Sequence, residues 1–223
     1  MTYTALITGA AEGIGFEVAK RLAERGYRVL LTARTLARAS EPARALGVEA
    51  RALDVADPLA ASRISDDVDV LVNNAALYPP DRDAGGVLDA PLEEWQDLVA
   101  TNFLGALWTA RAFVPGMLAR GYGRVVNVSS DYGSFGLGLH GPASYSVTKA
   151  ALDALTKKLA EDCAHVPDVK VNAVHPGWVR TKMGGKNATR SIEDGAREVL
   201  RLATLPSDGP TGKFFHDGNE MPW

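Results

Sequence analysis

Tyr145 and Lys149 are the residues of this chain whose types and spacing most directly suggest chemistry. Positions four apart in a helix lie on one face. A lysine ammonium about 4 Å from a phenol stabilises the phenolate by roughly 1–4 kcal/mol, or about one to three pKa units. The pair therefore predicts a tyrosine that donates or accepts a proton near working pH. A half-buried tyrosine above a surface lysine has the same spacing, so the prediction depends on what lies nearby.

Further polar positions could complete such a site. Ser129 and Ser130 end an apolar stretch with the pattern of a strand, and ligands of parallel sheets bind outside the carboxyl ends of the strands. A serine hydroxyl there can bind a substrate carbonyl and the phenol together, or it can simply cap a turn. Asn102 lies within a long predicted helix, where asparagine is a poor helix former. Its amide either holds a water near the lysine or belongs to an ordinary polar face.

Three glycines form a candidate phosphate-binding turn. Gly9, Gly13 and Gly15 join the first predicted strand to the first predicted helix. Glycines let the backbone approach a pyrophosphate closely, and a helix N-terminus presents free N–H groups to it. The spacing G-x-x-x-G-x-G differs from the G-x-G-x-x-G fingerprint, and a turn needed only for packing is the alternative. The place of the turn, after the first strand of an alternating chain, favours nucleotide binding.

The end of the second predicted strand indicates which cofactor would bind. An acidic residue about 20 positions beyond the glycines would accept the 2′-hydroxyl of NAD, and Ala33 stands there instead. Arg34 follows and can bind a 2′-phosphate through two charge-assisted hydrogen bonds. This favours NADP(H), with NAD(H) still possible. A solvated surface arginine is the alternative, and Glu12 opposes phosphate binding by repulsion.

The elements that must position these residues alternate along the chain. Short apolar runs alternate with helical stretches, which predicts an α/β fold: a Rossmann-type, doubly wound parallel sheet of about seven strands with helices on both faces. The predicted strands cover residues 3–8, 28–33, 48–53, 68–72, 123–129, 169–174 and 213–216. The predicted helices cover residues 14–25, 36–46, 58–66, 91–118, 143–164 and 192–203. Without a linker or an internal repeat, residues 1–223 are expected to form a single dinucleotide-binding domain.

Composition excludes several classes of protein. Hydrophobic residues make up 46% and charged residues 23%, which are globular proportions. A net charge of −3 gives no basic surplus for nucleic acid or anionic lipid. Cys163 is the single cysteine, and no leader or apolar run of about 18 residues is present. We therefore expect a cytoplasmic protein that binds neither nucleic acid nor membrane.

Taken together, these motifs resemble those of the short-chain dehydrogenase/reductase family. The matching stretches are residues 8–15, Asp54-Val55, Asn73-Asn74-Ala75-Ala76, Asn102, residues 128–130, residues 145–149 and residues 176–181. They occur in the family's order along essentially the whole chain, and the set is specific although each member alone is not. The segment 176–223 is most similar to the carbonyl-reductase branch.

The resemblance implies a role for each matching residue. Tyr145 would transfer the proton, and Lys149 would lower its pKa and hold the nicotinamide ribose. Ser130 would orient the carbonyl; Ser129 is the weaker candidate because neighbouring side chains of a strand point to opposite faces. Asn102 would anchor a proton-relay water. Besides Tyr145 and Lys149, the implied cofactor contacts are Gly9, Gly13, Ile14, Gly15, Arg34, Asp54, Val55, Asn74, Pro176, Gly177, Val179 and Thr181, with no metal.

The chain departs from the family pattern in three ways. Ala76 stands where glycine is usual, a change of one methyl group. Ser130 and Tyr145 are two residues further apart than is usual, so the intervening loop should bulge. The chain also lacks a long insertion that the carbonyl-reductase branch often carries there and that blocks oligomerisation. A homodimer or homotetramer formed through the helices near 91–118 and 143–164 is therefore expected.

We interpret the sequence as an NADP-dependent oxidoreductase that transfers hydride between nicotinamide and a carbonyl or secondary alcohol. An apolar pocket favours a ketone, aldehyde or quinone with an apolar body. The expected lining residues are Tyr132, Phe135, Leu137, Leu139, His140, Trp178 and Met183. The alternatives are a non-catalytic NADP-binding redox sensor on the same fold and an NAD-linked secondary-alcohol dehydrogenase.

Overall fold

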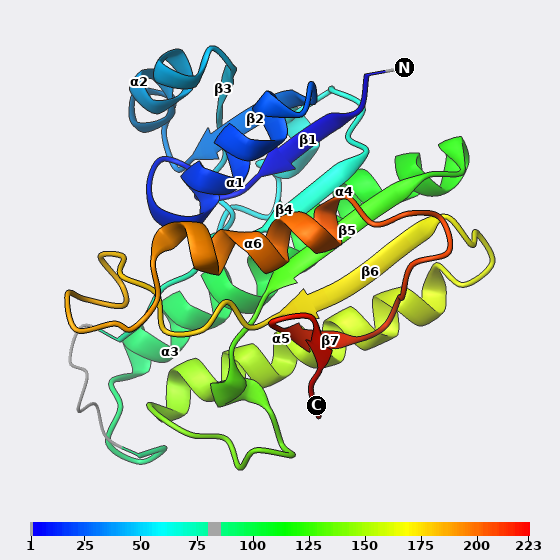
Figure 1. Ribbon diagram of the computed structural model, residues 1–223. Helices are drawn as coiled ribbons and strands as arrows, with labels where there is room; N and C mark the ends of the chain where they lie inside the picture. The colour runs from blue at the N-terminus through cyan, green and yellow to red at the C-terminus, as the bar shows by residue number, and fades with distance from the viewer. Residues whose placement is uncertain (1, 80–85) are drawn as a thin grey trace.

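An eight-stranded sheet forms the centre of the protein in a computed structural model that describes residues 2–79 and 86–223 (Figure 1). The strands lie in the order β3-β2-β1-β4-β5-β6-β7-β8, and only the last pair is antiparallel. Their bounds are β1 (Thr4–Ile7), β2 (Arg28–Ala33), β3 (Glu49–Ala52), β4 (Val70–Asn73), β5 (Gly123–Val128), β6 (Val169–Val174), β7 (Phe214–His216) and β8 (Asn219–Glu220). The predicted doubly wound fold is confirmed, with β8 as an additional strand.

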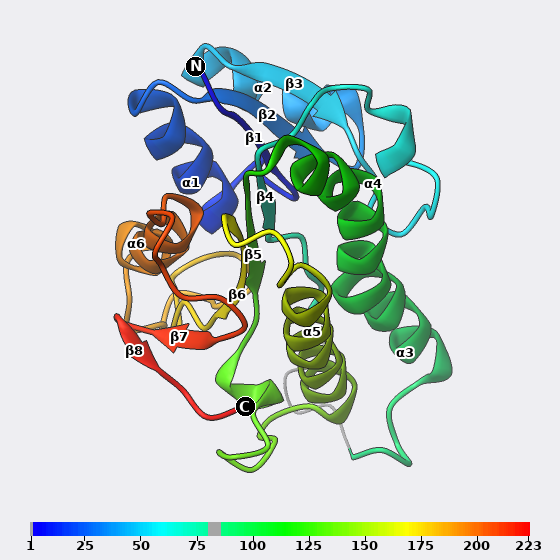
Figure 2. The same ribbon diagram turned by 90° about the vertical axis from the view of Figure 1, so that its right-hand side faces the viewer.

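Helices cover both faces of this sheet (Figure 2). The helices α1 (Gly13–Glu24), α2 (Leu36–Leu46) and α6 (Ile192–Ala203) pack on one face. The helices α3 (Leu92–Leu98), α4 (Gly105–Arg120) and α5 (Ala143–Asp162) lie on the other. Side chains of β1 alternate between the two cores: Ile7 packs towards α1 and α6, whereas Leu6 packs towards α4. Burial on both faces explains why the strands are continuous Val/Leu/Ile runs.

The parallel strands end at the edge where the glycine turn and the serine pair lie. Strand β1 pairs with β4, although the chain continues from β1 to β2 on the other side. The loops after β1 and β4 therefore diverge, which opens the crevice in which such sheets bind ligands. The loop after β6 extends to the same end, at the lower left of Figure 1.

The prediction of one continuous helix over 91–118 is wrong, because the structure has three consecutive helical segments there. A π-helical segment, Val99–Leu104, separates α3 from α4 and contains Asn102. Such segments are rare and are frequently found at functional sites. At the start of α4, a Cβ on Gly105 would lie 2.8 Å from Cβ of Val55, so the helix approaches the loop after β3 closely. The helix predicted over 58–66 is likewise reduced to a 3-10 turn, Ala61–Arg63.

Candidate active site

The glycine turn after β1 is packed too tightly for side chains. Gly9 has φ +61°, and a Cβ there would lie 2.9 Å from Cα of Ala75. A Cβ on Gly15 would lie 2.6 Å from Nδ2 of Asn74. Gly13 has φ +63°, a conformation that residues with side chains rarely adopt. The backbone of the turn is thus held against the loop that follows β4.

Asn74 and Thr8 fix the shape of this turn. The Asn74 amide donates hydrogen bonds to the carbonyls of Thr8 (3.0 Å) and Gly9 (3.1 Å). The Thr8 hydroxyl accepts from the backbone N–H groups of Asn74 (3.0 Å) and Ala75 (2.9 Å). In this structure Asn74 therefore supports the turn, while its contact with an adenosine ribose stays a prediction.

The N-terminus of α1 suits an anionic group. Glu12 is the N-cap residue in extended conformation, and its side chain does not cap the helix. The first N–H groups are therefore left for a ligand, and the helix dipole favours a phosphate there. Glu12 instead forms an ion pair with Lys182 from the loop after β6. This pairing offsets the repulsion that the sequence predicted for Glu12.

Of the residues expected at the adenosine end of the cofactor, the two charged ones are exposed and the two apolar ones are buried. Ala33 is buried at the end of β2, and Arg34 is exposed. The Arg34 guanidinium forms no hydrogen bond or ion pair with the other residues that the structure describes. Asp54 is exposed, and its carboxylate accepts from the backbone N–H of Ala56 (3.1 Å). Val55 is 6% exposed and lies against α4.

Tyr145, Lys149 and Ser130 come together between β5 and α5. Tyr145 and Lys149 are 7% and 2% exposed, and the Lys149 ammonium lies 5.5 Å from the centroid of the Tyr145 ring. Lys149 Nζ donates to the carbonyl oxygen of Val128 at 2.8 Å. Ser130 is the second residue after β5, so helix and strand together place all three polar groups at the carboxyl end of the sheet.

The shift of the tyrosine pKa runs opposite to the expected direction. Burial raises the pKa of Tyr145 above its ordinary value, and a hydrogen bond with Ser130 lowers it in part. Burial also lowers the pKa of Lys149 to about 8, which Asp153 counteracts. Because Lys149 is bonded to Val128, it does not offset the burial of the phenol here. The neutral phenol is thus the stable form, which suits a proton donor.

The Asn102 side chain is held by hydrogen bonds to two neighbouring segments, and its role as the anchor of a proton-relay water stays a prediction. It is 2% exposed, and its Oδ1 accepts from the backbone N–H of Leu77 at 2.7 Å. Its Nδ2 donates to the Leu77 carbonyl (3.0 Å) and to the Thr148 hydroxyl (3.1 Å). Both amide hydrogens are used, so the side-chain amide does not hold a water by donation. Asn102 ties the loop after β4 to the helix that carries Tyr145 and Lys149.

The segment after β6 reaches the glycine turn from the opposite side. Gly177 has φ +80°, and a Cβ there would lie 2.2 Å from Cδ of Arg190. Val179 is 4% exposed and pairs with Arg190 in an isolated bridge. A Cβ on Gly13 would lie 3.3 Å from Cγ2 of Thr181. Pro176, which precedes these residues, begins the segment expected at the nicotinamide end.

Two tyrosines flank the Tyr145 ring. Tyr132 has its ring centroid 6.3 Å from that of Tyr145, and Tyr78 has its centroid at 4.8 Å. Tyr132 belongs to the expected pocket, together with Phe135, Leu137 and Trp178, which are 73%, 40% and 50% exposed. Tyr78 was not among the residues expected at the site, although it lies just after the Asn-Asn-Ala-Ala stretch that matches the family.

The chain's last residues support the loop that bears the expected pocket residues. The backbone N–H of Gly136 donates to the carbonyl of Trp223 at 2.8 Å, and the Ser134 hydroxyl donates to the carbonyl of Pro222 at 2.8 Å. The Trp223 ring stacks on Phe214 of β7 at 5.7 Å.

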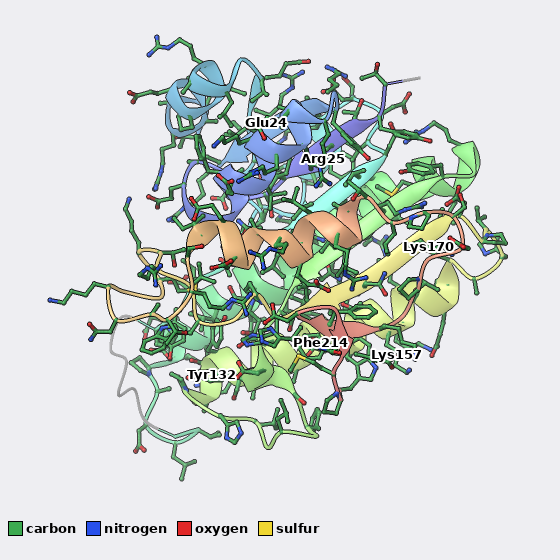
Figure 3. All side chains as sticks on the ribbon, in the orientation of Figure 1. Glu24, Arg25, Tyr132, Lys157, Lys170 and Phe214 are labelled. Carbon is green, nitrogen blue, oxygen red and sulfur yellow. The ribbon has the colours of Figure 1, made fainter. Side chains whose placement is uncertain are left out.

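A separate hollow of about 520 Å³ lies at the opposite end of the sheet. It is lined by the last turn of α1, the start of β2 and the end of α2, and it contains none of the residues discussed above. Glu24 borders it, far from Tyr132 (Figure 3). The chemistry-bearing residues therefore do not belong to this hollow.

The doubly wound sheet, the glycine turn and the serine–tyrosine–lysine set define a dinucleotide-binding oxidoreductase. Residues 3–191 match the family described as "short chain dehydrogenase". The chain is 33% identical to the 3-oxoacyl-[acyl-carrier-protein] reductase FabG of Escherichia coli over 212 residues, covering 91% of this chain and 82% of that protein. It is 32% identical to carbonyl reductase [NADPH] 1 of Sus scrofa over 281 residues, covering 100% of this chain and 94% of that protein.

A solved structure titled "short chain dehydrogenase/reductase family protein" superposes with a TM-score of 0.86 at 32% identity, covering 96% of this chain and 94% of that one. The chain belongs to the short-chain dehydrogenase family, whose members are oxidoreductases that bind a nicotinamide cofactor. The described residues contain no helix that is long and apolar enough to cross a membrane.

Proposed function

We propose that this protein is an NADP(H)-dependent oxidoreductase that reduces a ketone, aldehyde or quinone with an apolar body. The observation that carries the proposal is the buried phenol of Tyr145, which lies one helical turn from Lys149 and near enough to the Ser130 hydroxyl for that group to lower its pKa in part. A neutral phenol bonded to a serine hydroxyl can hold a carbonyl oxygen and give it a proton. A redox sensor would have no need for this donor.

The residues of the glycine turn fit a dinucleotide. Gly9, Gly13 and Gly15 leave no room for side chains, and the α1 N-terminus has no side-chain cap. These groups would hold the pyrophosphate, and Arg34 would bind a 2′-phosphate. When bound, the nicotinamide supplies the hydride. Lys149 would hold its ribose after leaving the Val128 carbonyl.

The relatives support a carbonyl substrate without selecting one. Carbonyl reductase [NADPH] 1 and FabG are both similar to this chain, and both names describe a reductase. An NAD-linked secondary-alcohol dehydrogenase is the second candidate, because the same groups serve both directions. We further propose a single cytoplasmic domain over residues 1–223 that forms a homodimer or homotetramer, to be tested by light scattering.

Turnover by matched variants tests the proposed function. With NADPH and a panel of carbonyls, Tyr145→Phe should lose about 10²–10⁴-fold in kcat, because general acid catalysis has this magnitude. Its cofactor Kd should stay near that of wild type. Lys149→Ala should both lower kcat and raise the cofactor Kd. A Tyr145→Phe variant that keeps more than about a tenth of wild-type kcat would remove the proton-donor role.

A further inference from the structure

A carboxylate lies beside the proposed carbonyl-binding hydroxyl. Asp131 follows Ser130 in the 3-10 turn Asp131–Gly133, and the Ser130 hydroxyl donates to Asp131 Oδ1 at 3.0 Å. The charge of Asp131 also contributes to the raised pKa of Tyr145, after burial and Tyr78. The Asp131 side chain is 35% exposed, so a ligand at Ser130 can reach it.

Within the part of the chain that the structure describes, no cation neutralises this carboxylate. Its single ion-pair partner there is His175, with Nδ1 3.5 Å from Oδ1 of Asp131. The backbone N–H of Asp131 donates to the same Nδ1 at 3.3 Å, so this nitrogen carries no proton. Burial lowers the pKa of His175 to about 4, and Arg190 nearby is bonded to Asp217 through two contacts of 2.6 Å. His175 is therefore neutral at pH 7, so this contact leaves Asp131 without a cationic partner among the described residues.

Two more aromatic rings lie beside the Tyr145 ring. The rings of Tyr78 and Tyr132 have their centroids 4.8 and 6.3 Å from that of Tyr145 and are tilted by 58° and 87° to its ring. The faces of such rings carry negative potential and attract cations. A carboxylate with three phenol rings suits a positively charged group better than a neutral one.

The position of Asp131 also has a consequence for the reaction. A carbonyl that gains hydride becomes an alkoxide, and a nearby carboxylate opposes this build-up of negative charge. A substrate that carries its own positive charge would neutralise the carboxylate when it binds. Since a carbonyl oxygen bonded to Ser130 lies about 3 Å from that hydroxyl, an ammonium two or three bonds from the carbonyl carbon can reach Asp131.

We propose that this site selects carbonyl substrates that carry a cationic amine two or three bonds from the carbonyl carbon, with Asp131 as the counter-ion. The inference rests on the proposed reduction and adds a substrate class to it. Asp131 binds the ammonium, the Ser130 hydroxyl turns from Asp131 to donate to the carbonyl oxygen, and the Tyr145 hydroxyl donates to the same oxygen.

Two ketones of the same shape test this selectivity. One is cyclohexanone with two methyl groups on the carbon opposite the carbonyl, and the other replaces that carbon with a quaternary nitrogen. The kcat/KM for each is measured with NADPH in wild type and in Asp131→Asn. The preference for the cationic ketone should fall by about tenfold or more in Asp131→Asn, the order expected for loss of one contact between charged groups. Taking the ratio removes the intrinsic reactivity of each ketone.

Matched variants separate charge recognition from other effects. Asp131→Glu keeps the charge and should keep most of the preference. Asp67→Asn removes one charge from a carboxylate that is 83% exposed and lies before β4, away from the site, and it should behave as wild type. An equal loss for both ketones in Asp131→Asn would mean that Asp131 only positions Ser130, which overturns the proposal.

A binding measurement keeps the inference testable if neither ketone is reduced. Calorimetry measures the affinity of dimethylpiperidinium, which is the quaternary ring without its carbonyl, for wild type and for Asp131→Asn in the presence of NADP. Weaker binding by about tenfold in the variant supports the counter-ion role. Equal binding overturns it. If the protein binds the cation in this way but reduces neither ketone, the result counts against the proposed reduction and not against the role of Asp131.

Discussion

Asp153 is a buried acid that the proposed reaction does not use, and its removal should change stability in a defined pH window. It lies one turn after Lys149 in α5 and is 4% exposed. Neither carboxylate oxygen has a hydrogen-bond partner among the described residues. Burial raises the pKa of Asp153 to about 7, while the nearby Ser129 hydroxyl and the Lys149 ammonium lower it in part. We therefore choose the isosteric substitution Asp153→Asn.

The expected change in the free energy of unfolding follows from this pKa shift. The pKa of Asp153 rises from 3.8 to about 7. At 1.36 kcal/mol per unit, this corresponds to about 4 kcal/mol of free energy of unfolding, as an order of magnitude. The folded protein holds a proton that the unfolded chain releases within this window. The contribution of Asp153 to the free energy of unfolding is therefore largest below pH 3.8, and it decreases as the pH rises to about 7.

Urea unfolding of both proteins between about pH 4.5 and 7.5 measures this contribution. The wild type should lose stability relative to Asp153→Asn as the pH rises. His175, with its pKa lowered by burial to about 4, adds an opposite slope to both proteins and cancels in the difference. Parallel stability curves would refute the reasoning, because they would mean that Asp153 titrates normally.

The same variant should change the pH profile of turnover. Asp153 counteracts the burial that lowers the pKa of Lys149 to about 8. Without that negative charge the ammonium should lose its proton at a lower pH. If the reaction needs charged Lys149, the alkaline limb of kcat/KM should move to lower pH in Asp153→Asn. If the alkaline limb of kcat/KM does not move, Asp153 has a structural role only.

Two further predictions concern the cofactor. Arg34→Ala should weaken kcat/KM for NADPH by about tenfold or more and leave NADH nearly unchanged, and adding Ala33→Asp should reverse the preference; equal effects on both cofactors would make Arg34 a surface charge only. Gly15→Ala should lower cofactor affinity and cost about 1–3 kcal/mol of stability, because its Cβ would lie 2.6 Å from Nδ2 of Asn74. Titration of NADPH and thermal unfolding check the second prediction, and a wild-type result in both would show that the turn can relax.

Elements with strong local signals were predictable from the sequence. The bounds of β2, α2, β6 and α6 agree with the predicted ranges. The helix α2 illustrates the reason: Thr35 accepts from the backbone N–H of Arg38 at its start, and Gly47 ends it with φ +66°. Such signals lie within a few residues of the element that they define.

The interrupted helix over 91–118 was not predictable in this way. Its π-helical segment surrounds Asn102, whose side chain bonds to Leu77 and Thr148. These partners are 25 and 46 residues away along the chain. Local propensity marked asparagine as unusual in a helix but contained no information on what it would bond to. The same limit explains why Tyr78 was missed beside Tyr145.

The two serines at the end of β5 show how one rule of strand geometry organises both sides of the site. Neighbouring side chains of a strand point to opposite faces, and Ser130 interacts with Tyr145 and Asp131 while Ser129 faces Asp153. Lys149 belongs to both sides, since it lies between Tyr145 and Asp153 on α5. A change in the charge of Asp153 should therefore reach the phenol through Lys149, whereas a change at Asp131 acts on the substrate side. Asp153→Asn should consequently change the pH profile without changing the choice of substrate, whereas Asp131→Asn should change the choice of substrate and also lower the pKa of Tyr145.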